Sequence, residues 1–363
     1  RPALCEKNTA LLREGMYADF RCIAKREFHA ENGLELNITD FEILSSPAEA
    51  PHVSSMDTEV STEEEIREKN RFLLRGNSNY IYLFSGYLLQ AFRDFMLNNE
   101  FAEMTTPVIG EKSEKLSFGF DYFGQNAELA FSPQLALAPC TAAFERVFEI
   151  SHSFSAKRHG STRHLNEFTS MNFQIGYIED LDDVINITSR LLNHIAAYLK
   201  ANHGGFLDAH KITLPKADNI PTLALCEAFE ILKTKPRGDL HPTEIKTLSE
   251  RIKSTQDCDF VFVRGISPSN GEFYIRRKNG GAQKFELYFK GLKIASGSEN
   301  ISDFSELDNA AAKHSAYFDA VKYGIMPYGG AMIGLERFAA RFLDLSNIRR
   351  AAVFPRDVHN LAP

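Results

Sequence analysis

The chain has 363 residues, of which 44% are hydrophobic and 25% charged. This is the composition of a globular protein long enough for one large domain and one small one. The formal net charge of −7 excludes a global basic field for nucleic acid, although it leaves room for a local basic patch. No apolar run approaches the ~20 residues of a membrane span, and the start shows no signal-peptide pattern. We therefore expect no membrane partner.

The cysteines indicate the redox compartment. There are five, at Cys5, Cys22, Cys140, Cys226 and Cys258, and they form no Cys-x-x-Cys pair. An odd, scattered set favours a reducing cytoplasm and argues against a zinc site built from cysteine.

The first 66 residues have a mixed pattern. The stretch CEKNTALLREG (5–15) predicts a helix. Two strands are predicted, over ADFRCIAKREF (18–28) and LELNITDFEIL (34–44). In the second, apolar residues alternate with polar ones. The serines, acids and prolines that follow are typical of a linker. We expect a small domain over 1–46, a linker over 47–66 and the main domain over 67–363.

The main domain mixes helices with strands. Residues 78–98 predict a helix with one apolar face, formed by Ile81, Phe84, Leu88, Ala91, Phe92 and Phe95. It leads into a short strand that ends near Pro107. Further helices are expected over 181–202, closed by Gly204–Gly205, and over 223–233. Strands are expected on both sides of Gly291, and YGGAMIGLERFAARFLDL (328–345) predicts a strand followed by a helix. Without βαβ regularity this order favours an α+β fold with a mostly antiparallel sheet flanked by helices.

The segment 144–178 predicts two strands joined by a charged loop. Its second strand alternates strictly. Ser170, Asn172 and Gln174 fall on a polar face, and Met171, Phe173, Ile175 and Tyr177 fall on an apolar face that is expected to be buried.

Three segments now coincide in order and spacing. They are the helix leading to Pro107, the hairpin with TRHLNEFTSMNFQIGY (162–177), and GGAMIGLERF (329–338) trailed by NIRRAAVFPRD (347–357). With FSPQL (131–135), they resemble the three motifs of class II aminoacyl-tRNA synthetases, specifically the aspartyl/asparaginyl subgroup. The resemblance covers roughly residues 15–363.

The resemblance implies an α+β core in which a mostly antiparallel sheet of six or seven strands cradles ATP. It also implies a homodimer with the first helix and Pro107 at its interface. Residues 1–46 resemble part of the oligonucleotide-binding barrel that reads the anticodon in this subgroup, but they are too few for five strands. Either a segment precedes Arg1 or the protein reads no anticodon, so tRNA stays an open partner.

The resemblance also assigns site residues. Phe168 matches the aromatic that stacks on adenine, and Glu167 an adenine-side residue. The phosphates are assigned to Arg163, His164 and Arg337, which are also the catalytic candidates, and Gly329, Gly330 and Gly334 allow close backbone approach. Ser132, Gln134 and, more loosely, Glu114 match the amino-acid pocket, where Gln134 would hold the substrate ammonium. The alternatives are core packing for Phe168 and a structural role for the Ser-Pro-Gln turn.

Several family residues are replaced. Where the family has Phe-Arg-x-Glu, this chain has Phe154, Ser155, Ala156 and Lys157. Loss of that arginine, which holds the α-phosphate, commonly costs about 10²–10³ in rate. Leu137 and Asn300 replace two cations that recognise aspartate. Asn172 and Gln174, which line the substrate side, replace an acidic pair.

The magnesium ligands are altered too. Glu286 and Ser296 match ligand positions, but Lys293 replaces an acidic one, and an ammonium cannot bind a dication. These exchanges make the predicted ATP site more cationic than that of the family. Lys157 and Lys293 are therefore also predicted to contact ATP.

Three hypotheses follow. In the first, the chain is an ATP-dependent ligase that activates a small carboxylate as an acyl-adenylate. A neutral amino acid suits it better than free aspartate, and the acceptor is the usual tRNA or another molecule. In the second, it is a non-catalytic paralogue with a regulatory, scaffold or RNA-associated role. In the third, it is an ordinary synthetase whose motif residues lie one position away from these assignments.

Overall fold

The computed structural model describes residues 11–30, 33–49, 61–69, 73, 78–111, 117–269, 272–307, 311 and 314–361. The chain divides into two compact units, Arg1–Ser78 and Asn79–Pro363. Within the described residues, no helix is both long enough and apolar enough to cross a membrane. The four described cysteines are free thiols.

The first unit contains the two strands that the sequence predicts. β1 (Tyr17–Arg26) pairs antiparallel with β2 (Leu34–Ser45). A short helix, α1 (Thr62–Arg67), follows, and the side chain of Ser61 caps it by accepting the N–H of Glu64. Most of the helix expected over 5–15 lies outside the described residues.

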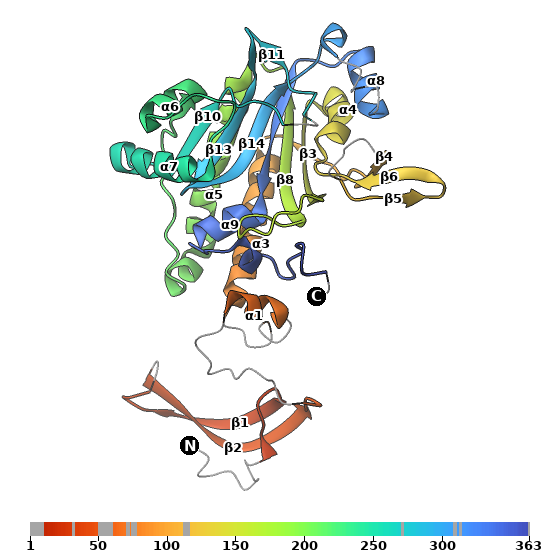
Figure 1. Ribbon diagram of the computed structural model, residues 1–363. Helices are drawn as coiled ribbons and strands as arrows, with labels where there is room; N and C mark the ends of the chain where they lie inside the picture. Colours follow the sequence, from red (N-terminus) through yellow and green to blue (C-terminus); the bar gives the residue numbers. More distant parts are fainter. Residues whose placement is uncertain are drawn as a thin grey trace. The chain divides into compact units, whose positions relative to one another are not determined.

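The second unit is built on a sheet of eight strands (Figure 1). Their spatial order is β3 (Ala102–Glu103), β7 (Arg146–Phe154), β8 (Glu167–Gly176), β15 (Tyr328–Gly334), β14 (Leu292–Asn300), β13 (Lys284–Phe289), β10 (Phe260–Arg264) and β9 (Thr222–Ala224). The six central strands are antiparallel, whereas the short edge strands β3 and β9 pair in parallel. The predicted antiparallel sheet is confirmed, and the two edges extend it to eight strands.

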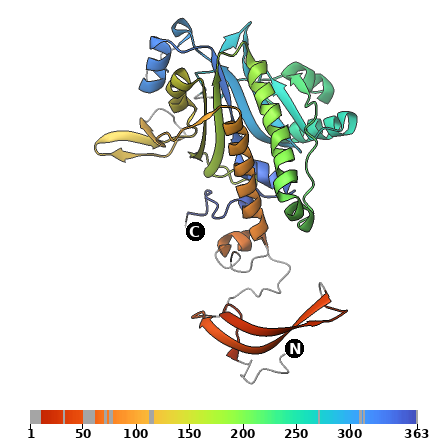
Figure 2. The ribbon, with the colours of Figure 1, turned by 180° about the vertical axis from the view of Figure 1, so that it is seen from behind.

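Two long helices, α3 (Asn79–Asn98) and α5 (Leu181–Ala209), lie side by side and cover one face of this sheet (Figure 2). The remaining helices are α4 (Gln134–Phe144), α6 (Leu225–Leu232), α7 (Pro242–Gln256), α8 (Ser315–Tyr323) and α9 (Leu335–Phe342), with short 3₁₀ turns η3 (Phe304–Glu306) and η5 (Ile348–Ala351). The small strands β4 (Ile109–Glu111), β5 (Gly119–Tyr122) and β6 (Gln125–Leu129) form a separate sheet, and β11 (Arg277–Lys278) pairs with β12 (Gly281–Ala282).

The predicted alternation of β8 decides which face is core. Met171 and Phe173 are buried with Phe148 of β7, and Phe92 of α3 packs edge-on against Phe148 at 5.8 Å. The opposite face carries the polar residues and is not covered by α3 and α5. The sheet therefore presents a polar surface directly above a closed apolar core.

Three expectations were wrong in detail. Tyr177 is 67% exposed, because β8 ends at Gly176 and Tyr177 adopts a left-handed backbone at φ 58°. The helix expected to close at Gly204 continues to Ala209, with a kink at His203, whose ring stacks on Tyr87 of α3 at 3.7 Å. That packing offsets the low helix propensity of the glycines. The strand before Pro107 ends already at Glu103.

Candidate active site

The polar face of the central strands gathers most of the predicted site residues. The register places Phe168, Ser170, Asn172 and Gln174 of β8 on the same face as the pocket residues of β14. Asn172 donates to Ser170 Oγ at 2.8 Å, and Ser170 Oγ lies 2.7 Å from Ser153 Oγ of β7. Since these side chains bond to one another across strands, the centre of the face is a neutral network.

Phe168 lies at the end of this row, half-buried, with its ring edge-on to Phe131 at 5.9 Å. The next residue, Thr169, donates its backbone N–H to both carboxylate oxygens of Glu336, at 2.9 and 3.1 Å. Burial raises the pKa of Glu336 to about 7, against the opposing effect of those hydrogen bonds. Glu336 thus fixes the start of α9, which carries Arg337, against the end of β8 that carries Phe168.

Glu167 does not join this group. It alternates with Phe168, so it falls on the other face of β8, where its Oε1 lies 3.6 Å from His152 Nδ1. The structure separates these two residues, which the sequence comparison placed together around adenine.

Basic side chains gather around His164, from the loop between β7 and β8 and from the start of α9. Ser161 Oγ lies 2.6 Å from Nδ1 of His164, and the ring of His159 stacks on His164 at 4.2 Å. Burial first, and then Arg337, His159, Arg163 and Lys157, lower the pKa of His164 to about 4. We call Lys157, Arg163, His164 and Arg337 the basic cluster. The positive charges of Lys157, Arg163 and Arg337, which lower the pKa of the neutral His164 between them, favour an anion.

The glycines of β15 differ in how closely other atoms surround them. A Cβ on Gly330 would lie 2.1 Å from the carbonyl oxygen of Phe173, and one on Gly329 would lie 2.5 Å from that of Ser298. Those two glycines are therefore required by strand packing. A Cβ on Gly334 would meet nothing closer than Ile294 O at 3.9 Å. A Cβ at Gly334, which precedes α9, would therefore make only an ordinary van der Waals contact.

Lys293 reaches the polar face because of an irregularity in the β13–β14 pairing. The register shifts between Leu287 and Tyr288, so that Tyr288 pairs with Lys293. Lys293 Nζ lies 2.7 Å from one oxygen of Glu286, and the hydroxyl of Tyr288 donates to the other oxygen at 2.7 Å. Burial alone would raise the pKa of Glu286, but Lys293 and these hydrogen bonds outweigh it and hold that pKa below its usual value.

This arrangement does not fit a divalent metal at Glu286 and Ser296. Ser296 does lie opposite Glu286 across the strands, but both oxygens of the carboxylate are already engaged. Among the residues that the structure describes, no three His, Cys, Asp or Glu side chains gather closely enough to hold a metal ion.

The amino-acid side of the face is lined by neutral groups. Gln174 donates to the carbonyl oxygen of Gln134 at 2.8 Å and accepts from Thr141 at 2.9 Å. The hydroxyl of Tyr274 donates to Oε1 of Gln134 at 2.7 Å. Ser132 accepts the backbone N–H of Gln134 at 3.2 Å, and so shapes the turn that begins α4. Tyr274 and Thr141 were missed by the sequence comparison, because nothing local marks residues that meet only through folding.

The other predicted substrate residues are also neutral. Ser298 donates to Oδ1 of Asn300 at 2.7 Å, and Leu137 is fully buried in α4. Glu114 lies outside the described residues.

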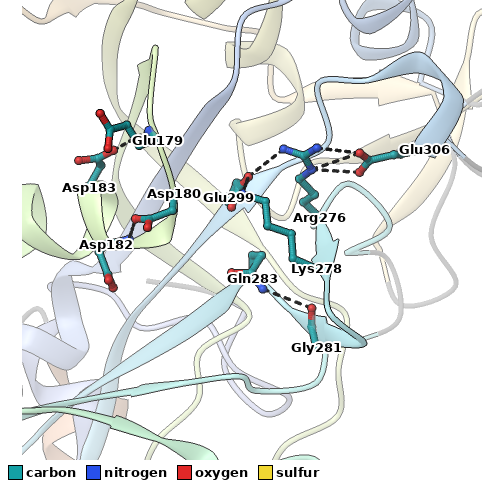
Figure 3. Close-up of polar contacts among 10 residues, drawn as sticks. All are labelled: Glu179, Asp180, Asp182, Asp183, Arg276, Lys278, Gly281, Gln283, Glu299 and Glu306. Carbon is teal, nitrogen blue, oxygen red and sulfur yellow. Dashed lines mark hydrogen bonds and ion pairs between the residues drawn. The ribbon is translucent and has the colours of Figure 1, made fainter.

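The charged residues near Asn300 belong to a separate cluster, shown in Figure 3. Glu299 alternates with Asn300 and points away from the polar face. Arg276 and Lys278 reach Glu299 at 3.1 and 2.7 Å, and Arg276 also holds Glu306 at 2.8 Å. These cations are therefore engaged with Glu299 and Glu306, on the side of the sheet away from the polar face.

Figure 3 also shows the acidic side chains at the start of α5, which accept hydrogen bonds from backbone N–H groups there. Asp180 accepts the N–H of Asp182 at 2.8 Å, and Asp183 accepts that of Glu179 at 2.7 Å. The first contact caps a backbone donor of the first helical turn, and the second satisfies the N–H of the residue that precedes the cap.

An antiparallel sheet with this hairpin, and an arginine at the start of the helix that follows β15, define the catalytic core of a class II aminoacyl-tRNA synthetase. The family model "tRNA synthetases class II (D, K and N)" matches residues 63–358, and the chain belongs to this family.

Relatives agree with that assignment. The chain is 34% identical over 360 residues to an aspartate–tRNA(Asp/Asn) ligase of Deinococcus radiodurans, a match that covers 92% of this chain and 83% of the relative. It is 32% identical over 352 residues to the corresponding ligase of Thermus thermophilus, with the same coverage. Its fold is similar to that of an asparaginyl-tRNA synthetase from Pyrococcus horikoshii, solved with asparaginyl-adenylate. The TM-score is 0.84 at 23% identity, over 95% of this chain and 84% of that one.

Proposed function

We propose that this protein is an ATP-dependent, AMP-forming ligase that activates a small carboxylate as an acyl-adenylate. The observation that carries this proposal is the basic cluster, which the loop before β8 and the start of α9 bring together around His164, with Phe168 following that loop on β8. An aromatic ring and a set of cations at one end of a strand suit a nucleotide, whose base stacks while its phosphates need neutralising.

In the proposed reaction, Phe168 stacks on adenine, and Arg337 and Arg163 hold the phosphates. His164 is neutral at physiological pH, so it would offer a hydrogen bond rather than a charge. A carboxylate oxygen attacks the α-phosphorus, the new O–P bond forms, and the bond to pyrophosphate breaks. Ser155 follows Ser151 and Ser153 in the alternation of β7, so it would face the α-phosphate with a hydroxyl only.

The substrate proposed is an amino acid with a neutral side chain rather than free aspartate. The pocket side of the face is formed by amides and hydroxyls of Gln134, Gln174, Tyr274 and Asn300. A carboxylate side chain buried there would lack a cation, which costs several kcal/mol, whereas an amide would find both donors and acceptors.

The test is ATP–pyrophosphate exchange, measured with each amino acid in turn. We expect exchange with one neutral amino acid and no exchange with aspartate. Arg337→Ala should lower the exchange rate about 10²- to 10³-fold, and Lys246→Met on the exposed face of α7 is the control that should not. Absence of exchange with every carboxylate tested would refute the activity.

A second candidate function is a non-catalytic paralogue with a regulatory, scaffold or RNA-associated role. The loss of the arginine at Ser155 and the engagement of Glu286 by Lys293 favour it. This function predicts no adenylate formation. Tight, magnesium-dependent ATP binding would count against it.

The partners proposed are a second copy of the chain and a tRNA or other acceptor in the cytoplasm. Leu83 and Leu97 of α3 and Ile109 near Pro107 are exposed apolar side chains, which suits a homodimer through this region. Residues 1–46 are proposed as part of an anticodon-type barrel, joined by the linker 47–66 to the catalytic domain 67–363. Light scattering should give a dimer mass that Ile109→Glu lowers, and a wild-type monomer would contradict this arrangement.

A further inference from the structure

The Lys293–Glu286 pair lies near Arg337, to which the proposed function assigns a phosphate of the nucleotide. The register shift at Leu287/Tyr288 turns the side chain of Lys293 onto the polar face. Arg337 donates from Nη1 to the backbone carbonyl of Lys293 at 3.4 Å, and the carboxylate of Glu286, which holds Lys293 Nζ, opposes the effect of burial in lowering the pKa of Arg337, so the guanidinium lies near the pair. Lys293 is joined through Arg337 to the basic cluster.

The carboxylates of Glu286 and Glu272, which lie on and beside β13, have both oxygens engaged by an ammonium or a hydrogen-bond donor. Glu286 accepts from Lys293 and Tyr288. Glu272 accepts from Lys284 at 2.9 and 2.7 Å and from the hydroxyl of Ser269 at 2.7 Å. A dication would have to displace an ammonium from one of them, and it would then face that ammonium as a like charge at short range.

Lys293 is built to move between two anions. Its side chain remains 38% exposed, whereas that of Glu286 is only 10% exposed. The ammonium therefore can turn toward a phosphate while Glu286 keeps its hydrogen bond from Tyr288. The ammonium of a lysine is a point charge on a flexible chain and can change partners, whereas the planar guanidinium of Arg337 binds in a fixed geometry.

We propose that this site takes the phosphates of a nucleotide without a divalent metal, with the ammonium of Lys293 in the metal's place. The inference rests on the proposed ATP binding and goes beyond it. With an acidic residue at 293, the site would need a metal ion to accept phosphates, whereas Lys293 removes that need. ATP therefore needs no divalent metal to bind here, and Glu286 acts as the counter-ion that holds Lys293 until the phosphates arrive.

The experiment is calorimetric titration of the full chain with ATP, once in EDTA and once in excess MgCl₂. For the wild type we expect the Kd in EDTA to lie within about threefold of the Kd in MgCl₂, or below it, because the counter-charge is already present. Lys293→Glu restores a pair of carboxylates and should make the Kd at least about tenfold weaker in EDTA than in MgCl₂.

Two further variants keep the test decisive should Lys293→Glu fold poorly. Glu286→Gln frees the ammonium while it keeps a hydrogen-bond acceptor for Tyr288, so it should tighten metal-free ATP binding about tenfold. Lys246→Met removes an exposed lysine of α7 and should change neither Kd. As a measurement without nucleotide, Mn²⁺ binding followed by electron paramagnetic resonance should be absent in the wild type and present in Lys293→Glu.

The outcomes separate the two proposals. Wild-type binding that appears only with MgCl₂, or wild-type capture of Mn²⁺ that Glu286→Gln abolishes, would overturn this inference and leave the proposed ATP binding intact. Absence of ATP binding under both conditions would remove the proposed function, and this inference with it.

Discussion

Placing an arginine at residue 155 is expected to raise the rate of ATP–pyrophosphate exchange. The backbone N–H of Ser155 donates to Asn166 O at 2.8 Å, so the ladder of β7 and β8 continues one step beyond the strands. Ser155 therefore keeps the alternation of Ser151 and Ser153 and faces the phosphates. A preorganised donor at such a point contributes about 10²–10³ in rate, or about 3–4 kcal/mol.

The same substitution adds charge to a region that is already cationic. At ~8 Å and an effective dielectric of ~40, each neighbouring cation repels the new guanidinium by about 1 kcal/mol. Lys157 follows two residues later and shares Asn166 as a hydrogen-bond partner with Ser155, so Ser155→Arg should lower the thermal unfolding midpoint. The double variant Ser155→Arg, Lys157→Glu should recover it, because the new pair is of opposite charge.

The assay is exchange with the amino acid that gives the highest wild-type rate, at saturating ATP. His152→Arg is the matched control, since His152 lies on the same strand but on the opposite face and is exposed. It should leave the exchange rate unchanged. If Ser155→Arg folds, binds ATP and still gives no gain, the assignment of the α-phosphate to this end of β7 is wrong.

Replacing Phe168 by Ala removes base stacking worth about 1–3 kcal/mol, so the Kd for ATP should rise about 5- to 150-fold; an unchanged Kd would place adenine elsewhere. Because the pKa of His164 is about 4 and phosphates favour its protonated form, ATP binding near pH ~5.5 should take up part of a proton. Calorimetry in buffers of different ionisation enthalpy measures this uptake, and its persistence in His164→Asn would exclude His164 as the source. The pKa of Glu336 is raised from 4.5 to about 7, so the folded state holds its proton to higher pH than the unfolded state and loses stability as pH rises through this window. Urea unfolding should show Glu336→Gln gaining up to about 3 kcal/mol over the wild type between pH ~4 and pH ~8, and a pH-independent difference would contradict this. Gly330→Ala, with its Cβ 2.1 Å from a backbone oxygen, should lower the free energy of unfolding by about 1–3 kcal/mol. Gly334→Ala should leave the free energy of unfolding unchanged and weaken ATP binding. If both variants lose the same free energy of unfolding, the distinction between the two glycines is wrong.

Local periodicity was enough for most of the secondary structure. The apolar spacing over 78–98 gave α3 almost to the residue, and the strict alternation after Phe168 gave both faces of β8. These elements were predictable because their burial pattern repeats within a single segment. The end of α5 was not, because Tyr87 of another helix stabilises the kink at His203.

The structure shows which of the predicted site residues lie together, whereas their roles stay predictions. The comparison of motifs brought Arg163, His164 and Arg337 together, and the fold joins them around one surface. It also placed Glu167 beside Phe168, which the alternation of β8 separates. It had no means of finding Tyr274, whose partner Gln134 lies 140 residues away in the chain.

The sequence by itself determined the family, the strands and helices, and which family residues were exchanged, because motifs and periodicity are local properties of a chain. Only the tertiary structure decided which residues the exchanged side chains contact. The register shift between β13 and β14 turns Lys293 onto the polar face and against Glu286. Coulomb energy depends on the distance between charges, and that distance is set by strand pairing rather than by order along the chain.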